Sequence, residues 1–535
     1  MDKKKHHETG ERTSNPDVSE FEKGVQVQLQ GKTALNDPQS EDSQVFPKPT
    51  ADPLDPLNWS GFRKHTILGI VMLNYFLFTY ITTTTVPSFP EIQRQFGITY
   101  SQANWTVAVP ALGLSLGPLI WSSLGEIYGR RLIFLSGTLI ALISTIGAAV
   151  ASSYEGYMAA RFFQGFGVSP ASTVGMAIVN DLFFEFERGQ KLGMWVLAVD
   201  SGLLLGPTFG GIFNHISASW INWFNAILFG ILLVLELFFM PETLYPRQHM
   251  LLTLTTRTQN NPNNHKEMIQ DSYWPPEAPE LCRTTSLPFI TLRPIPGIFH
   301  PNVWDSVTRL LLTFKFPVVV IAVLGYSFTW YWWTLSIITM VPAAYPQYTP
   351  LIQGFLFLGL FIGTLVSEII CSGRLSDYIV KRLMMRNNNV RIPEMRLWLS
   401  YPAILSTAIG LVLWGISIEN NYHWMVGQVA FFLFSAGIQI GNTVITSYIV
   451  DAYPLQSTST ITFYAVFFNL SAFVNPFFIA NWESAVGWTW TFTGQALIVL
   501  CLSTSIVLVL HKFGPWLRNN SPKPTWVNPE YDLGM

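Results

Sequence analysis

Two charged side chains interrupt long apolar stretches of this chain. Asp200 lies in the middle of the apolar run 191–213, and Arg161 lies within the run 157–180. A charge in the hydrocarbon core of a membrane costs about 2.5–3.5 kcal/mol on insertion scales, so such residues are functional candidates by default. Asp200 could take up a proton or neutralise a cationic substrate, or it could be a hydrogen-bonded aspartate between helices. Arg161 could be a structural arginine that donates to backbone carbonyls.

The composition supports reading these runs as membrane spans. The 535 residues are 49% hydrophobic and only 12% charged, whereas a soluble protein is about a quarter charged. The mean hydropathy is +0.31. The net charge of −2 gives no indication of nucleic acid binding, and three distant cysteines indicate neither a disulfide framework nor a metal site. Because the sequence contains no Walker-type loop, zinc-ligand cluster or nucleophile elbow, we expect no enzyme, no ATP-driven pump and no cofactor.

Twelve apolar runs approach or exceed the length of about 20 residues that a spanning helix needs. Numbered as spans 1–12, they are 66–86, 103–123, 132–152, 157–180, 191–213, 220–240, 316–342, 350–372, 397–418, 422–446, 457–481 and 488–511. A long polar segment separates the two sets of six, which indicates a duplicated transporter. We therefore expect an all-α membrane protein of two six-helix bundles with pseudo-two-fold symmetry.

These runs divide the chain into five parts. A disordered tail (1–58), a first bundle (59–240), a central loop (241–314), a second bundle (315–512) and a second tail (513–535) follow one another. Nearly all Lys and Arg residues fall in the tails, in the loops that follow even-numbered spans, or at the membrane edges next to these loops. Basic residues accumulate in cytoplasmic loops, so we expect both termini in the cytoplasm. We also expect a plasma-membrane location and a monomer in the lipid bilayer.

The loops after spans 2 and 8 carry similar charged sequences, SSLGEIYGRRL (122–132) and GRLSDYIVKRL (373–383). The first contains Glu126, Gly129, Arg130 and Arg131, and the second contains Asp377, Lys381 and Arg382. In each, an acid precedes a basic pair and could tie helix ends together through ion pairs and hydrogen bonds. A basic loop with incidental acids is the alternative. The repetition at equivalent positions favours a pair of latches that break and reform as the halves rock.

Span 5 contains the glycine-rich run DSGLLLGPTFGG (200–211). Glycine and proline would weaken such a helix in a soluble protein. Between membrane helices, however, small residues permit close backbone packing, and neighbours can satisfy the carbonyl freed by proline. The motif residues are Gly202, Gly206, Pro207, Gly210 and Gly211. Gly202, Gly206 and Gly210 recur every four residues and form a stripe on one face of the helix. Ordinary helix packing is the alternative role for such a stripe.

Polar and aromatic side chains lie on several spans. The candidate cavity residues are Asn74, Gln164, Trp330, Trp333, Gln439 and Asn442. Gln439 and Asn442 are three residues apart and so share a helical face. The consecutive aromatic residues of span 7 cannot all share one face, so some are expected to contact lipid or sit in the interfacial belt, and one or two could stack on substrate. They are Trp330, Tyr331, Trp332 and Trp333. Hydrogen bonding between helices is the alternative for the polar residues.

The motifs together resemble the major facilitator superfamily, and more narrowly its fungal twelve-span drug:proton antiporter group. SSLGEIYGRR resembles the family's loop 2–3 motif, RFFQGFG the span-4 motif, and GLLLGPTFGG the span-5 exporter pattern at every fixed position. DPLNWS (55–60) and PETLYPR (241–247) are also similar to segments of this group. Ser122 and Glu126 stand where glycine and aspartate are usual. The resemblance covers about residues 55–515.

The resemblance implies a proton-coupled secondary transporter that exports small amphipathic organic molecules by alternating access. It implies that Asp200 and Arg161 couple protons, that the glycine stripe packs on a span of the other half, by analogy span 8, and that spans 1, 4, 7 and 10 line the cavity. From their positions nearer the inner ends of spans 6 and 8, Glu236 and Glu368 are each expected to pair with other groups at the membrane interface, with proton coupling as the alternative. A proton-linked importer of a cationic nutrient such as a polyamine is the alternative, and a non-transporting sensor is a third class.

Overall fold

The computed structural model describes residues 49–50, 52–245, 247, 302–388, 390–453 and 456–522. Within these ranges all regular structure is helical, with no strand. Twelve helical segments are long and apolar enough to cross a membrane, which confirms the predicted number of spans. Most of the predicted first tail and most of the predicted central loop lie outside the described residues, as do residues 523–535. The prediction that the second tail is disordered from residue 513 is wrong for its first residues, because helix α23 (Thr504–Asn520) continues through them.

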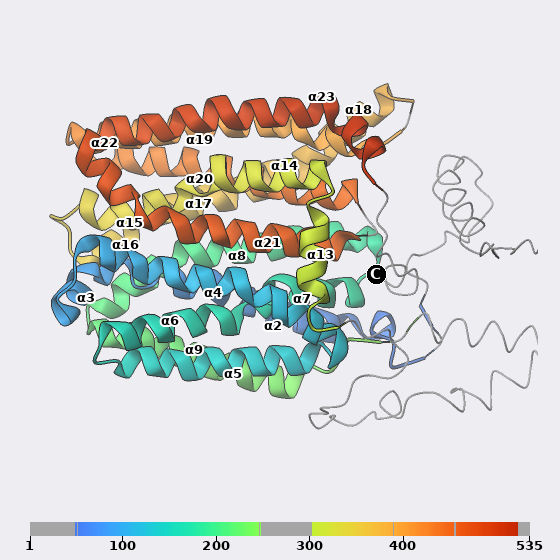
Figure 1. Cartoon of the computed structure of the whole chain (residues 1–535), viewed down its shortest axis with the longest axis horizontal. Helices are drawn as coiled ribbons and strands as arrows, with labels where there is room; N and C mark the ends of the chain where they lie inside the picture. The colour runs from blue at the N-terminus through green and yellow to red at the C-terminus, as the bar shows by residue number, and fades with distance from the viewer. Residues whose placement is uncertain are drawn as a thin grey trace, which may run out of the picture.

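The first half of the chain supplies six spans (Figure 1). They are α2 (Gly61–Thr83), α4 (Tyr100–Ile127), α5 (Arg130–Val150), α6 with α7 (Tyr154–Val168 and Pro170–Leu182), α8 (Glu185–Asn214) and α9 (Ala218–Phe239). Short helices lie at their ends: η1 (Pro56–Asn58), η2 (Val86–Ser88) and α3 (Phe89–Phe96). We call this set the amino-terminal half.

The second half supplies the other six spans, several of which are broken into shorter helices. These are α14, η3 and α15 (Pro317–Tyr326, Ser327–Tyr331, Trp333–Ala344); α16, α17 and η4 (Pro350–Leu356, Leu358–Ser367, Glu368–Leu375); α19 (Ser400–Glu419); α20 (Trp424–Ala452); α21 and η7 (Ser457–Val474, Asn475–Phe477); and α22, η8 and α23 (Ile479–Ile498, Val499–Ser503, Thr504–Asn520). Helices α13 (Asp305–Thr313) and α18 (Ser376–Arg386) lie outside the spans, and η5 (Pro393–Leu399) begins the span that α19 continues.

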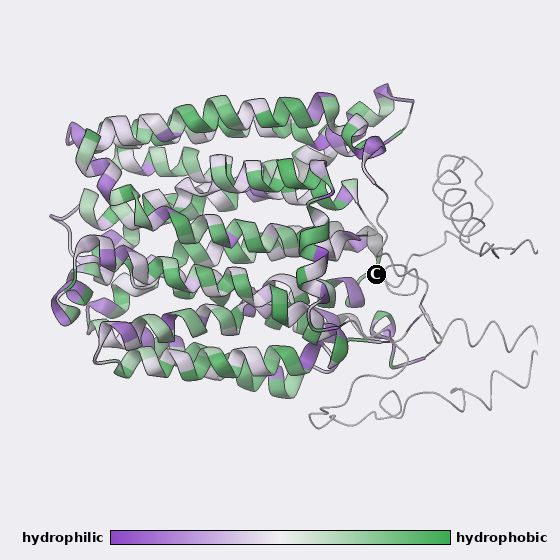
Figure 2. Ribbon diagram, viewed as in Figure 1, coloured by the Kyte–Doolittle hydropathy of each residue, from purple (hydrophilic) through white to green (hydrophobic). Residues whose placement is uncertain are grey.

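The helices lie side by side, with short elements at both ends of the bundle (Figure 1). We call the end that holds α13 and α18 the terminal face and the end that holds α3 the distal face. Hydrophobic residues are concentrated along the spans and hydrophilic residues toward the two ends (Figure 2). Large apolar side chains are exposed on the perimeter, including Ile143, Ile231, Leu405 and Leu508. Such a surface would be unfavourable in water and matches the hydrocarbon of a bilayer.

Two features differ from the sequence-based expectation. The end of the predicted polar linker forms α13, which lies across the terminal face and contacts both α4 and α21 (Figure 1). Spans 7, 8 and 12 contain π-helical turns in η3, η4 and η8. Such turns arise where a helix carries one extra residue, they occur often at functional sites, and hydrophobic periodicity does not reveal them.

The two halves meet along two seams. Helix α4 packs on α21 at one seam, and α8 packs on α16 and α17 at the other. Hydrogen bonds cross the first seam from Ser115 Oγ to the Val466 carbonyl at 2.9 Å and from Tyr100 Oη to the Thr339 carbonyl at 2.8 Å. These contacts tie the halves together at two depths in the membrane.

The glycine stripe of α8 packs mainly on α2, within its own half. A Cβ at Gly202, Gly206 or Gly210 would overlap backbone or hydroxyl atoms of α2. The close approach also allows Thr83 Oγ1 to donate to the Leu203 carbonyl at 2.8 Å. The expectation that these three glycines face the other half is therefore wrong. The four-residue repeat correctly indicated a contact face but carried no information about which helix lies against it.

Only the last glycine of the motif faces span 8 as expected. A Cβ at Gly211 would overlap the Pro350 carbonyl of α16. Beside it, Thr208 Oγ1 donates to the Gly354 carbonyl at 2.9 Å. Successive residues are about 100° apart around a helix, so Gly211 points away from Gly210. The motif thus serves two contacts, one within a half and one between halves.

Substituting Gly210 with alanine tests the packing of α8 on α2. The added methyl group would overlap the Thr84 backbone, and overpacking costs about 1–3 kcal/mol. Gly230→Ala on α9 is the matched control, because nothing lies within 4 Å of its added Cβ and alanine favours a helix by about 1 kcal/mol over glycine. We expect Gly210→Ala alone to lower the thermal unfolding midpoint in detergent. Equal midpoints for the two variants would contradict this packing.

Candidate functional site

Asp200 lies at the seam between the halves, where α8 approaches α20. Its side chain is buried, with 5% of the residue exposed. Asn442 of α20 donates from Nδ2 to Asp200 Oδ2 at 2.8 Å. The amide oxygen of Asn442 accepts hydrogen bonds from Tyr464 Oη and Thr446 Oγ1. We call these four residues the central cluster. It joins one carboxyl of the amino-terminal half to polar groups on α20 and α21.

Aromatic rings surround the central cluster. Tyr75 stacks on Trp195 with ring centroids 4.1 Å apart, and Tyr331 stacks on Phe468 at 3.7 Å. The phenols of Tyr75, Tyr331 and Tyr464 lie within electrostatic range of the Asp200 carboxyl. A carboxyl among aromatic faces can hold a proton, or it can accept an organic cation that the rings attract through their π electrons.

Glu368 places a second carboxyl near the same part of α20. Gln439 Nε2 donates to Glu368 Oε2 at 2.8 Å, and Thr443 Oγ1 donates to the same oxygen at 3.0 Å. Helix α20 therefore binds one carboxyl from each half within two turns, at Asn442 and at the Gln439–Thr443 pair. Glu368 thus binds neutral donors on α20, whereas the sequence predicted pairing near the membrane surface. Its position in the π-helical η4 could not be inferred from the apolar run.

Arg161 is fully buried and binds only neutral groups. Its guanidinium donates to the carbonyls of Ile81, Thr82 and Thr106, to Gln164 Oε1 and to Thr85 Oγ1, at 2.7–3.3 Å. Gln164 in turn donates to Thr145 Oγ1 at 3.1 Å. No hydrogen bond or ion pair joins Arg161 to Asp200 in the described part of the chain. The structural reading of Arg161 thus fits its contacts, and a role in proton coupling stays a prediction.

Three more predicted cavity residues bond within single halves, as Gln164 and Gln439 do, so that only Asn442 of the six bonds across the halves in the described part of the chain. Asn74 donates to Glu236 Oε1 at 2.8 Å within the amino-terminal half. In the other half, Trp330 donates to Thr407 Oγ1 at 3.0 Å and Trp333 donates to the Thr329 carbonyl at 3.1 Å. The phenols that interact electrostatically with Asp200 belong to Tyr75, Tyr326, Tyr331 and Tyr464. The sequence singled out Tyr331 only as one of four consecutive aromatic residues in span 7, and nothing except an aromatic side chain within a span marks the other tyrosines.

The loop 2–3 acid contacts α13 of the central loop rather than its own basic pair. Glu126 is 2% exposed, and its Oε2 lies 3.6 Å from Arg309 Nη1 on α13. One turn earlier, the hydroxyls of Ser123 and Ser306 share a hydrogen bond. Because α13 also contacts α21, these two pairs connect the halves at the terminal face. The predicted latch therefore includes a helix of the central loop.

The basic pair of the same loop holds the end of span 6. The backbone N–H groups of Arg130 and Arg131 donate to the Glu242 carboxylate at 2.9 and 3.1 Å. Burial raises the pKa of Glu242, although the backbone N–H groups of Leu244, Arg130 and Arg131 favour its charged form. Gly129 precedes α5 with φ of 98°, a conformation that favours glycine.

The second charged loop does not repeat these contacts. Lys381 and Arg382 are exposed, and no ion pair is found for either among the described residues. The side chain of Asp377 lies outside what the structure describes. In the carboxyl-terminal half the terminal face is instead tied by Arg391 and Arg396, which both lie 2.7 Å from Asp451 Oδ2. Lys381 and Arg382 therefore do not make the contacts that Arg130 and Arg131 make, although the sequence predicted equivalent loops.

The segments DPLNWS and PETLYPR pack against each other at the terminal face. Arg247 Nη2 lies 2.9 Å from Asp55 Oδ1, and both side chains are buried. Tyr245 Oη donates to Asp52 Oδ2 at 2.6 Å. These bonds fasten the entry to span 1 onto the exit from span 6, a pairing that their separation in sequence concealed.

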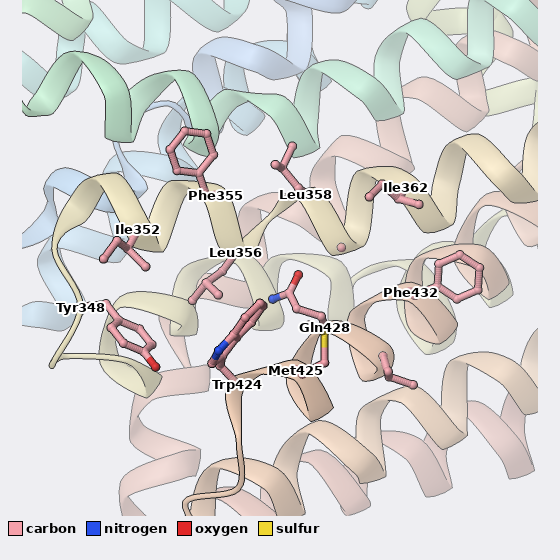
Figure 3. Close-up of a pocket in the computed structure, with 12 residues that line it drawn as sticks. Tyr348, Ile352, Phe355, Leu356, Leu358, Ile362, Trp424, Met425, Gln428 and Phe432 are labelled. Atoms are coloured by element: carbon pink, nitrogen blue, oxygen red, sulfur yellow. The ribbon is translucent and has the colours of Figure 1, made fainter.

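A separate groove of about 680 Å³ opens between α16, α17 and α20. Figure 3 shows Leu356, Leu358, Trp424 and Gln428 around this space. Its lining is mostly apolar, and several lining side chains are exposed on the perimeter of the bundle. None of the predicted cavity residues lines it, so it is distinct from the central cluster. Among the described residues, no group of three or more His, Cys, Asp or Glu could hold a metal ion.

The fold and these motifs agree with a comparison against protein families. The model of the Major Facilitator Superfamily matches residues 71–476. The chain belongs to the Major Facilitator Superfamily. It is therefore a membrane transporter rather than an enzyme.

Relatives extend over most of this transporter. The chain is 28% identical over 445 residues to a probable efflux pump, mfs2, of Aspergillus flavus, covering 81% of this chain and 98% of that protein. It is 24% identical to a probable drug/proton antiporter, YHK8, of Saccharomyces cerevisiae, covering 91% of each. The crystal structure of a D-xylose–proton symporter has a TM-score of 0.57 at 15% identity, covering 84% of this chain and 97% of that one. This last likeness concerns the fold alone.

Replacing Arg161 with lysine tests whether its hydrogen bonds hold this transporter together. Lysine keeps the charge but cannot reach acceptors on α2, α4 and α6 at once, and each buried acceptor left unpaired costs about 1–3 kcal/mol. We expect a clear fall in the thermal unfolding midpoint in detergent. Arg94→Lys, at an exposed position on α3, is the matched control. An unchanged midpoint for Arg161→Lys would refute the structural role.

Proposed function

We propose that this transporter is a proton-coupled exporter of small amphipathic organic compounds that works by alternating access. The observation that carries the proposal is the hydrogen bond from Asn442 to Asp200, because it crosses the seam between halves. A group that titrates at such a seam can make the relative stability of two arrangements depend on proton binding. The relatives named as an efflux pump and a drug/proton antiporter support export and proton use.

The coupling follows from the two protonation states of Asp200. Ionised Asp200 accepts a charge-assisted hydrogen bond from Asn442, which is about twice as strong as a neutral one. No cation pairs with this carboxyl among the described residues, so the charge relies on donors from the other half. A proton on Asp200 weakens that tie and removes the charge from an apolar surrounding. Protonation therefore favours arrangements in which the halves separate near the central cluster.

The same groups can bind the cargo. An organic cation could replace the proton at Asp200 while its apolar part lies against Tyr75, Tyr331 and Tyr464. Competition between proton and cargo for one carboxyl gives exchange in opposite directions. Uncharged amphipathic compounds could use the aromatic faces alone, and transport of both kinds would fit this arrangement.

We further propose that both termini lie in the cytoplasm, that the membrane is the plasma membrane and that the protein works as a monomer. The orientation is supported by charge, since Arg94 is the single basic residue in the loops of the distal face. Basic residues are concentrated toward the terminal face, and such residues are retained on the cytoplasmic side.

Asp200→Asn tests the proposed coupling. In proteoliposomes with an imposed pH gradient, we expect flux of the fluorescent cation ethidium to fall at least tenfold, because the carboxamide cannot exchange a proton. Movement of ethidium down its own gradient should persist if the seam still opens. Flux that responds to the pH gradient as in the wild type would overturn the proposal. Accumulation of ethidium on the proton-rich side would indicate export, and accumulation on the other side would indicate import.

Asn442→Ala tests the tie across the seam without touching the carboxyl. We expect flux to lose most of its dependence on the pH gradient, because protonation no longer changes a contact between halves. Asn469→Ala is the matched control, since Asn469 donates only to Ala465 of its own helix, at 2.7 Å. Equal effects of the two substitutions on coupled flux would argue against a special role for the Asp200–Asn442 bond.

A further inference from the structure

A second buried carboxyl, Glu236 on α9, lies entirely within the amino-terminal half. The residue is 0% exposed. Asn74 of α2 donates from Nδ2 to Glu236 Oε1 at 2.8 Å, and Thr138 of α5 donates to the same oxygen at 2.9 Å. The carboxyl thus joins three helices of one half. Its partners are neutral amide and hydroxyl groups, whereas the sequence predicted pairing near the membrane surface.

The charged and titratable groups on the packed helices leave Glu236 without a counter-charge. Arg131, near the start of α5, directs Nη2 to the Leu237 carbonyl at 2.7 Å. On α2, Tyr75 stacks on Trp195, and on α8, Asp200 binds Asn442. No ion pair involves Glu236 in the described part of the chain. An isolated buried carboxylate is strongly disfavoured unless it is paired or protonated.

Two acceptor atoms in this group have no donor. Glu236 Oε2 and Asn74 Oδ1 are both buried and lack a hydrogen-bond partner among the described residues. They belong to the two side chains that the Nδ2–Oε1 bond already joins. With an ionised carboxylate both atoms are acceptors, so neither can satisfy the other. Leaving a buried polar atom unpaired costs about 1–3 kcal/mol. A hydrogen atom between the two oxygens would let one donate to the other and avoid this cost.

We propose that Glu236 is a proton-binding site that carries its proton on Oε2. The acid O–H then donates to Asn74 Oδ1 while Asn74 Nδ2 donates to Oε1, so that acid and amide form a pair of hydrogen bonds. One proton thereby removes the buried charge and satisfies both unpaired acceptors. The Thr138 hydroxyl remains a third donor to Oε1.

The position of this site separates it from Asp200. Glu236, Asn74 and Thr138 all belong to the amino-terminal half, so rocking of the halves does not break their contacts. The proton at Glu236 is therefore resident, whereas Asp200 is the group whose contact changes at the seam. The resident proton locks α2, α5 and α9 together, and its loss at alkaline pH would place a charge among them. This inference does not depend on the proposed function.

Infrared spectroscopy of the purified full-length protein tests the proton directly. We expect the wild type at neutral pH to show a protonated-carboxyl C=O stretching band that is absent from Glu236→Gln and that shifts in D₂O. The Asp200→Asn variant should retain the band, which separates the two carboxyls. If Glu236→Gln instead loses only carboxylate bands, Glu236 is ionised, a bridging water satisfies its partners, and the proposal is wrong.

Stability and transport provide an independent readout. Glutamine can donate to Asn74 Oδ1 as the acid does, so Glu236→Gln should match the wild type at acid pH, where the carboxyl is protonated in the unfolded chain as well. Above the ordinary glutamate pKa of about 4.3, the unfolded wild type releases the proton that the folded protein holds, so its unfolding midpoint should fall below that of Glu236→Gln as pH rises. Glu155→Gln, at an exposed position on α6, should follow the wild type. A pH dependence shared by all three proteins would overturn the proposal.

The same variants distinguish this inference from the proposed transport mechanism. Glu236→Gln should retain ethidium flux driven by a pH gradient, because a resident proton is not exchanged in each cycle. Loss of coupled flux in Glu236→Gln with normal stability would contradict residence. If Asp200→Asn retains coupled flux while the infrared band at Glu236 is present, the proposed function fails and this inference stands.

Discussion

The structure depends on one constraint. A carboxyl buried between the two helical halves must receive its hydrogen bonds from the opposite half. Asp200 meets it through Asn442, and the close packing of α8 on α2 holds the carboxyl at that depth. Glycines at three positions of α8 make this packing possible, so the motif acts on the site indirectly. Aromatic rings exclude water from the central cluster and strengthen its electrostatic interactions, since charges interact more strongly at low dielectric.

The ends of the bundle show how such a site can be opened from one side at a time. At the terminal face α13 joins the halves through Glu126–Arg309 and Ser123–Ser306. Toward the distal face Tyr100 of α4 binds the Thr339 carbonyl of α15, again between the two halves. Alternating access requires one set of ties to break while the other persists. Each set is small and partly polar, so its rupture costs far less than separating the apolar seams.

The sequence predicted the number of spans and the fold class, because the thickness of a bilayer dictates the length of apolar runs. It also identified Asp200, Asn442 and Glu126 as candidates. It could not say which helix faces the glycine stripe, since a period of four residues defines a face and not a partner. Tyr331 lies beside Trp330 in the chain, yet a π-helical turn and a rotation of about 100° per residue decide which ring faces Asp200.

Distances between spin labels, measured as a function of pH, test the central claim most directly. Exposed positions are available at the terminal face (Phe62 and Tyr378) and at the distal face (Ile216 and Tyr422). If protonation of Asp200 weakens a tie across the seam, lowering the pH should change the two distance distributions in opposite directions, and Asp200→Asn should abolish this response. Distances that ignore pH, or that respond equally in Asp200→Asn, would contradict the account.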